Sequence, residues 1–393
     1  MTTEHASRTP RLSATLRTGG RVMPLELFFD LVFVLALTQC TALMAHEPTW
    51  EGLCKGLLAL GILWWAWVGY AWLTSVVDPE EGGVRLALIA AMAAMLVVAL
   101  AIPEAFEDYG LLFAGGLAVV RIAHIVLFAI ASRGDPGLRR SVTSLAISTA
   151  LGVGIIAAAS FTDGALQGGL WLLALLLDMG GPALFGAEGW KLEPEHFAER
   201  HGLIIIIALG ESIVAIGIGA EAGLTAGSVV AAVVGVFISA ALWWLYFDVV
   251  ALVAARRLEH AAPGRERNEI ARDSFSFLHL PMIAGIVLLA LGFKKTLEHV
   301  DDALKIQIAV AMLGGLVAYL LAHVAFRWRT VHRFSTQRVV AAAVLAALTP
   351  VAIEVPALLT LALVLLVLVV LVVYENRHFA ELRERLRHQV EAA

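Results

Sequence analysis

The stretch GLIIIIALGESIVAIGIGA, residues 202–220, decides the fold of this chain. It is almost wholly apolar, and Glu211 is its only charged residue. A run of this length is long enough to cross a bilayer as an α-helix. A carboxylate at that depth costs roughly 2.5–3.5 kcal/mol on insertion scales, so Glu211 needs a partner, water or a proton. The sequence therefore predicts an integral membrane protein with a polar interior, because other apolar runs also contain titratable residues, namely Asp30, Arg121, His124, Asp178, His279 and His323.

The composition supports the membrane assignment and excludes several function classes. Of the 393 residues, 60% are hydrophobic and only 16% are charged, and the mean hydropathy is +0.84. A soluble chain could not bury that much apolar surface. The net charge is −5 and the basic residues are scattered over loops, so we expect no nucleic-acid partner. Neither Cys-x-x-Cys nor His-Glu-x-x-His occurs, so we expect no metal site and no other cofactor.

Apolar runs between turn signals predict an all-α, polytopic membrane protein with about twelve transmembrane helices. The eleventh run is short and is bounded by Pro350 and Pro356, which makes it the weakest of the set. The expected spans are residues 25–44, 53–75, 85–102, 111–131, 141–160, 165–185, 202–220, 227–254, 274–293, 304–326, 339–351 and 356–374.

The distribution of positive charge indicates the orientation of these spans. When the N-terminus is placed in the cytoplasm, most of the 28 Lys and Arg residues fall in cytoplasmic segments. Lys294 and Lys295 fall on the opposite side, against this trend. We therefore expect both termini in the cytoplasm, and we divide the chain into an N-terminal tail (1–24), a first six-helix half (25–185), a charged surface connector (186–201), a second half (202–374) and a C-terminal helix (375–393).

Two pairs of spans share a pattern that predicts an internal repeat. The fourth span contains GGLAVVRIAH at 115–124, and the tenth contains GGLVAYLLAH at 314–323. The second and eighth spans share Leu-Trp-Trp at 63–65 and 242–244. We expect two parallel six-helix repeats related by an axis along the membrane normal. The alternative is that paired glycines and tryptophans merely serve helix packing and interface anchoring.

The first expected helix carries two acidic residues on one face. Glu26 and Asp30 are four residues apart, so their side chains project to the same side. For Glu26 the simpler interpretation is a charged helix start, because Pro24 suits a first turn and the helix dipole favours carboxylates there. Asp30 lies about 9 Å deeper than Pro24, where that interpretation weakens.

The fourth helix carries a permanent positive charge inside the membrane. Arg121 and His124 are three residues apart and share a face. Arg121 cannot lose its proton, so it is expected to pair with Asp30, Asp178 or Glu211. Asp178 has a second interpretation as a helix cap or as a side chain that reaches toward the headgroups.

The remaining candidates lie in the second half. Glu211 is interpreted either as an ion-paired carboxyl that fixes helix packing, as a proton- or cation-binding carboxylate, or as a protonated and tolerated residue. Tyr319 and His323 form a polar stripe, and His323 is the repeat equivalent of His124. The candidate pathway residues are therefore Glu26, Asp30, Arg121, His124, Asp178, Glu211, Tyr319 and His323.

Two motifs resemble a known family. Residues 24–39 (PLELFFDLVFVLALTQ) and 199–217 (ERHGLIIIIALGESIVAIG) resemble the two strongest motifs of the bacterial low temperature requirement A (LtrA) family. The resemblance covers essentially the whole chain. It implies a polytopic protein of the bacterial inner membrane, in a family named for a growth phenotype in the cold. It supplies neither a substrate nor catalytic residues.

The buried carboxylates and histidines favour a transporter or channel that moves a small solute or cation, with coupling to protons as one form of it. One alternative is an intramembrane enzyme acting on lipid or an isoprenoid carrier, in which acidic residues hold a metal or activate water. Another is a non-catalytic membrane protein for cold or stress adaptation. The expected partners are the lipid bilayer and the solute, and a homo-oligomer is compatible with all three functions.

Overall fold

The computed structural model describes residues 20–184 and 189–378. Across these ranges the chain forms helices joined by short connections, without a β-strand. Eleven helices in the described ranges are long and apolar enough to cross a membrane. The predicted all-α, polytopic architecture is confirmed, and the chain is a multi-pass membrane protein. The main spanning helices are α1 (Pro24–His46), α2 (Trp50–Thr74), α3 (Gly82–Ala101), α4 (Gly110–Ala131), α5 (Pro136–Ala159), α6 (Gly164–Leu184), α7 (Pro194–Gly219), α8 (Ala226–Phe247), α11 (His279–Glu298), α12 (Ile306–Val331) and α15 (Ala357–His378).

The eleventh expected span is helical but does not form one long helix. Its place is taken by α13 (Thr336–Ala347) and the one-turn α14 (Thr349–Ala352). Pro350 lies in the first turn of α14, because a proline has no N–H to continue the preceding helix. The apolar segment 336–352 is therefore shorter than the other spans.

The described part of the charged connector expected at 186–201 is partly helical. Its last residues form the first turns of α7, which begins at Pro194 and continues into the apolar run. Nearby, Asp135 caps the N-terminus of α5 by accepting a hydrogen bond from the Leu138 amide at 3.1 Å. Lys191 lies 2.6 Å from the same carboxylate and holds the pKa of Asp135 below its usual range.

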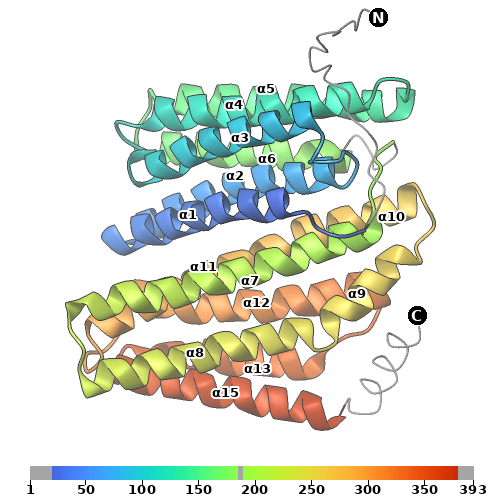
Figure 1. The fold of residues 1–393 in the computed structure, drawn as a ribbon. Coiled ribbons are helices and arrows are strands. Elements are labelled where there is room, and N and C mark those ends of the chain that lie inside the picture. The colour runs from blue at the N-terminus through green and yellow to red at the C-terminus, as the bar shows by residue number, and fades with distance from the viewer. Residues whose placement is uncertain (1–19, 185–188, 379–393) are drawn as a thin grey trace, which may run out of the picture. The chain divides into compact units, whose positions relative to one another are not determined.

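The contacts divide the chain into two compact units. Unit 1 comprises Met1–Phe33 and Trp65–Phe197, and unit 2 comprises Val34–Trp64 and Ala198–Ala393. In unit 1, α3 packs against α4, α4 against α5, and α5 against α6 (Figure 1). These units follow contacts rather than the order of the chain, and the predicted pair of six-helix repeats stays a prediction.

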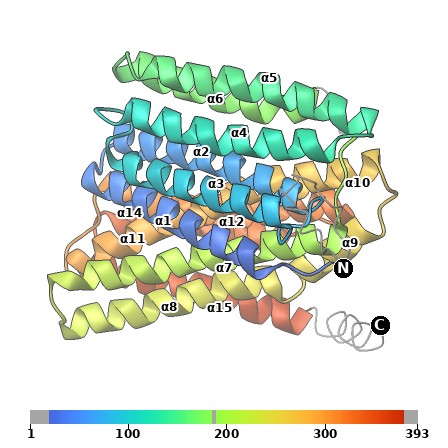
Figure 2. The same ribbon diagram turned by 45° about the horizontal axis from the view of Figure 1, so that its top comes forward.

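Unit 2 is built around the pair α11 and α12. Helix α12 also contacts α13, and α8 packs against both α11 and α15 (Figure 2). The closest approach within the α11–α12 pair is at Gly285 and Gly315, where a methyl group on Gly285 would collide with the Gly315 carbonyl oxygen. Small residues at such a point let two backbones pack closely in a membrane.

Helix α11 has an unusual beginning. The short helices α9 (Val250–Glu259) and α10 (Arg265–Ile270) precede a π-helical segment, Ala271–Phe277, which leads into α11. A π-helical turn places its side chains out of step with a regular α-helix and often occurs at functional positions. The single-turn 3₁₀ helices Ile102–Glu104 and Ala220–Ala222 end α3 and α7.

Candidate functional site

The acidic residues of α1 point away from lipid. Glu26 and Asp30 are buried, as is Phe33 one turn further on, whereas Phe28 and Leu31 are among the exposed apolar residues of the same helix. The helix thus presents apolar side chains outward and both carboxylates inward. The interior of unit 1 therefore receives two acidic side chains from one helix face.

Glu26 is held by a backbone amide and by a histidine. Its Oε2 accepts a hydrogen bond from the Met23 amide at 2.8 Å, and its Oε1 lies 2.8 Å from Nε2 of His196. Both side chains are fully buried. The expected role as a charged helix start is therefore only part of the arrangement, because Glu26 also joins the beginning of α1 to the beginning of α7.

Asp30 accepts a hydrogen bond from an aromatic side chain one helix away. The Trp67 indole N–H donates to Asp30 Oδ1 at 2.8 Å, and both side chains are buried. A buried tryptophan normally has a partner for its single N–H. The α1–α2 packing in unit 1 is thus fixed by a polar contact as well as by apolar ones.

Arg121 pairs with Asp178, as one of the three expected pairings had it. Its Nη2 lies 2.8 and 2.9 Å from the two carboxylate oxygens of Asp178. The Thr149 hydroxyl lies 2.6 Å from the same nitrogen and 2.8 Å from Asp178 Oδ1. Asp178 therefore neither caps a helix nor reaches for the surface, and this three-helix cluster joins α4, α5 and α6.

His124 lies among aromatic rings beside this cluster. Its ring centroid is 5.3 Å from that of Tyr70 and 5.1 Å from that of Phe128. The Tyr70 hydroxyl donates to the Val120 carbonyl at 2.7 Å rather than to the histidine. Neither ring nitrogen of His124 has a hydrogen-bond partner among the described residues. Gly69 faces the ring, and a larger residue there would collide with it.

Glu211 differs from the other buried carboxylates. The Thr38 hydroxyl donates to its Oε2 at 2.5 Å, and the glutamate is 1% exposed. No Lys, Arg or His in the described ranges forms an ion pair with it. The adjacent Ser212 hydroxyl is buried and has no hydrogen-bond partner within those ranges. The Thr41 hydroxyl and the charge of Lys294 also act on this carboxylate. Unit 2 thus contains a buried acidic group that accepts a hydrogen bond from a neutral hydroxyl and forms no direct ion pair within the described ranges.

Tyr319 and His323 belong to a larger aromatic cluster in unit 2. Nδ1 of His323 lies 2.8 Å from the Tyr319 carbonyl, and the Tyr319 hydroxyl donates to the Leu242 carbonyl at 2.8 Å. His279, which follows the π-helical segment, has Nδ1 3.1 Å from the Ser274 carbonyl and Nε2 2.8 Å from the Tyr246 hydroxyl. The carbonyl requires Nδ1 to carry the proton, so Tyr246 donates to Nε2.

A family model, the bacterial low temperature requirement A protein (LtrA), matches residues 21–373. The chain belongs to the LtrA family. It is also 32% identical over 311 residues to the uncharacterized protein RA0937 of Rhizobium meliloti (strain 1021). The aligned region covers 75% of this chain and 74% of the relative. No solved structure matches the chain.

The LtrA match spans every candidate pathway residue. Within the match, unit 1 contains Glu26, Asp30, Arg121, His124 and Asp178, and unit 2 contains Glu211, Tyr319 and His323. In the part of this LtrA chain that the structure describes, no group of three or more His, Cys, Asp or Glu residues is arranged to hold a metal ion.

From the sequence we did not predict that the first turns of α7 in this LtrA protein place side chains in the buried interior. His196 and Arg200 are both buried, whereas Glu195 and Glu199, which precede them by one residue each, are exposed. The spacing of four residues between His196 and Arg200 was the available signal, because it places both on one helix face. Tyr246 had a weaker signal, since a tyrosine near an expected helix end is typical of an interface anchor.

Proposed function

We propose that this LtrA protein is a membrane transporter or channel for a small solute or cation, and that Glu211 binds a proton or a cation during transport. The observation that carries the proposal is that the hydrogen-bond donor to Glu211 is an uncharged side chain. A buried carboxylate in a spanning helix is met by neutral threonine hydroxyls and forms no direct ion pair among the described residues, with Lys294 acting on it only at longer range.

The energetic comparison with Asp178 supports this choice of residue. Asp178 has its charge balanced by Arg121 at 2.8 Å, so it requires nothing further. An ionised carboxylate offers about four lone-pair sites, and Thr38 fills one of those on Glu211. The roughly 2.5–3.5 kcal/mol cost of a charge at this depth is then reduced most directly by a proton or by a bound cation.

We also propose that the protein lies in the inner membrane with both termini in the cytoplasm. The basis is the concentration of Lys and Arg in alternate connecting segments. In this orientation α7 enters from the cytoplasm at Pro194. Glu211 then lies about 25 Å along the helix, in the outer half of the bilayer.

Flux through proteoliposomes tests the proposal. The full chain is reconstituted with a pH-sensitive dye inside, and proton, K⁺ and Na⁺ gradients are applied in turn. We expect Glu211→Gln to lower the flux by about tenfold or more, because the amide keeps the shape but takes up no proton at neutral pH and has no negative charge to attract a cation. Thr38→Val should produce a smaller reduction, since it removes the hydroxyl and leaves the carboxylate.

Glu354→Gln is the matched control, because Glu354 is exposed between α14 and α15 and undergoes the same chemical change. Its flux should equal that of the unmodified protein. Wild-type protein that passes none of the three ions, or Glu211→Gln that passes them at the wild-type rate, contradicts the assignment of Glu211.

One observation favours the non-catalytic alternative for a part of the molecule. The Arg121–Asp178–Thr149 cluster is closed, with each charge met by its neighbour. We propose that this cluster serves packing in unit 1. If cells that carry the transport-inactive Glu211→Gln variant grow in the cold as well as wild-type cells, the buried charges of the whole protein serve packing rather than transport.

A further inference from the structure

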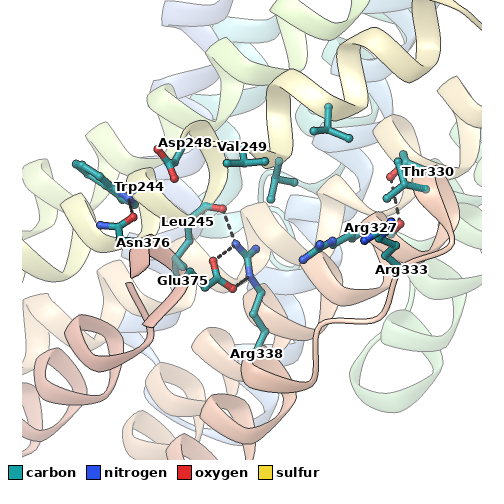
Figure 3. Close-up of a pocket in the computed structure, with 13 residues that line it drawn as sticks. Trp244, Leu245, Asp248, Val249, Arg327, Thr330, Arg333, Arg338, Glu375 and Asn376 are labelled. Atoms are coloured by element: carbon teal, nitrogen blue, oxygen red, sulfur yellow. Dashed lines mark hydrogen bonds and ion pairs between the residues drawn. The ribbon is translucent and has the colours of Figure 1, made fainter. Parts of the chain in front are cut away.

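A cavity with a volume of about 320 Å³ opens in unit 2 among the ends of α8, α12 and α15. Trp244 and Asp248 line it from the end of α8, Arg327 and Thr330 from the end of α12, and Glu375 from the end of α15 (Figure 3). All three helices end at this level, so the cavity lies at a membrane surface rather than at the centre of the bilayer. By the distribution of positive charge this surface is the cytoplasmic one.

Three guanidinium groups face the cavity, from Arg327, Arg333 and Arg338. Glu375 binds one of them through both oxygens, at 2.8 Å from Nε and 2.8 Å from Nη2 of Arg338. The Leu245 carbonyl accepts a further bond from Nη2 at 3.0 Å. Arg338 is thereby held rigidly in the wall.

The positive charge in the cavity exceeds the negative charge. Arg327 donates to the neutral Ser335 hydroxyl at 2.9 Å, and Asp248 is the only other carboxylate in the lining. Arg333 is exposed and forms no ion pair with any residue in 20–184 or 189–378. Guanidinium groups gathered in one cavity repel one another, and a bound anion removes that repulsion. Their planar fork of donors matches the oxygens of phosphate.

The helices that carry the cavity also offer an apolar surface beside it. Trp243 on α8 and Val370, Val373 and Tyr374 on α15 are exposed. Aromatic residues at a helix end are typical of the headgroup region, and the aliphatic ones suit acyl chains. A ligand that fits both features has a phosphate group, a net negative charge and hydrocarbon chains.

We propose that this cavity binds the phosphate headgroup of an anionic phospholipid, with its acyl chains along α8 and α15. Arg333 and Arg327 contact the phosphate, while Arg338, held by Glu375, supplies a fixed positive field. Basic pockets at the cytoplasmic ends of membrane helices are suited to such headgroups. The excess of arginine over carboxylate selects a net-negative headgroup over a zwitterionic one.

Native mass spectrometry of the full-length protein tests this. The protein is extracted from nanodiscs containing equal amounts of phosphatidylglycerol and phosphatidylcholine, and the retained lipids are counted. We expect phosphatidylglycerol to be retained preferentially. Arg333→Gln should reduce that preference about fivefold, and Arg327→Gln with Arg333→Gln about 25-fold, since each basic residue near the surface contributes about fivefold.

Arg140→Gln is the matched control, because Arg140 is an exposed arginine in unit 1 at the same expected membrane surface. It should keep the wild-type preference. A second arm adds millimolar inorganic phosphate to lipid-free protein in neutral detergent. If the wild-type protein binds inorganic phosphate in this arm but shows no preference for phosphatidylglycerol in the nanodisc arm, the lipid assignment is overturned.

Arg333→Gln is the principal variant because an exposed side chain without an ion pair can be changed without threatening the fold. If it keeps the full phosphatidylglycerol preference, the cavity is not the binding site. Equal retention of the two lipids by wild-type protein also overturns the proposal. The readout is lipid composition, so its failure is separate from any failure of transport through Glu211.

Discussion

Replacing Asp178 with leucine should destabilise unit 1 by about 3 kcal/mol, because it leaves the Arg121 charge buried without a carboxylate. Arg121 is 2% exposed and would retain only the Thr149 hydroxyl and a long contact of 3.4 Å to the Trp65 carbonyl. Removing one partner of a buried ion pair costs roughly 3–5 kcal/mol. The Asp178 side chain is 16% exposed, so the lower end of that range applies.

The reverse change has a smaller expected effect. Arg121→Met leaves Asp178 with the Thr149 hydroxyl at 2.8 Å. A carboxyl group can take up a proton, whereas a guanidinium cannot lose one. We therefore expect a loss of about 2 kcal/mol. The double variant replaces both charges with apolar groups and should also lose about 2 kcal/mol or less, because such replacements are often close to neutral.

The three values predict a coupling free energy of about 3 kcal/mol between Arg121 and Asp178. Equilibrium unfolding in mixed detergent micelles, followed by the fluorescence of the buried tryptophans, measures each variant. Thr149→Val serves as a milder comparison, with an expected loss of about 1.5 kcal/mol, the lower end of the range for hydrogen bonds to charged groups. The double-mutant cycle isolates the pair from the individual packing losses.

A coupling below about 0.5 kcal/mol would refute the reasoning, since it would mean that the two charges do not stabilise one another in the folded protein. An Asp178→Leu variant with the same free energy of unfolding as the parent would also refute the reasoning. It would require water or another anion to reach Arg121, which contradicts its burial.

Three further changes should have measurable effects. Trp67→Phe removes the donor to Asp30 and should lower the free energy of unfolding by about 1.5–3 kcal/mol, the range for a bond to a charged group; an unchanged midpoint would contradict it. Tyr246→Phe removes the donor to the unprotonated Nε2 of His279 and should shift the ¹⁵N resonance of that nitrogen; an unchanged resonance would contradict the assigned hydrogen bond. Gly285→Ala should cost about 1–3 kcal/mol through overpacking between α11 and α12, measured by thermal unfolding.

The spanning helices could be predicted because length and hydropathy are local properties of the sequence. The run that contains Glu211 became part of α7, and the weak eleventh run became the short α13 and α14, as its two prolines indicated. The start of α7 could not be placed, because the charged residues from Pro194 to Arg200 resemble a surface connector. Burial of His196 against Glu26 depends on a contact with α1, far away in the sequence.

The partners of the buried charges were only partly predictable. Helical periodicity assigns a residue to a face, but it does not identify the helix that the face meets. Arg121 therefore had three candidate carboxylates, and the packing of α4 against α5 and of α5 against α6 selected Asp178. The same packing gave Thr149 a place between them, which no charge pattern could indicate.

The acidic motif of α1 shows how hydrogen-bond donors of different kinds meet two membrane carboxylates on one helix face. Glu26 at the helix start receives a backbone N–H and an imidazole, which suit the polar end of a span. Asp30, about 6 Å deeper, receives the indole N–H of an aromatic side chain that is itself compatible with an apolar interior.

The Thr38 hydroxyl on Glu211, like the Trp67 indole on Asp30, is a neutral donor to a membrane carboxylate. A neutral donor stabilises a carboxylate without fixing its charge, whereas an arginine holds it ionised. Asp178 is paired with an arginine, whereas the hydrogen-bond donor to Glu211 is a hydroxyl. Under the role proposed for Glu211, substitutions at these two positions should therefore separate transport from stability.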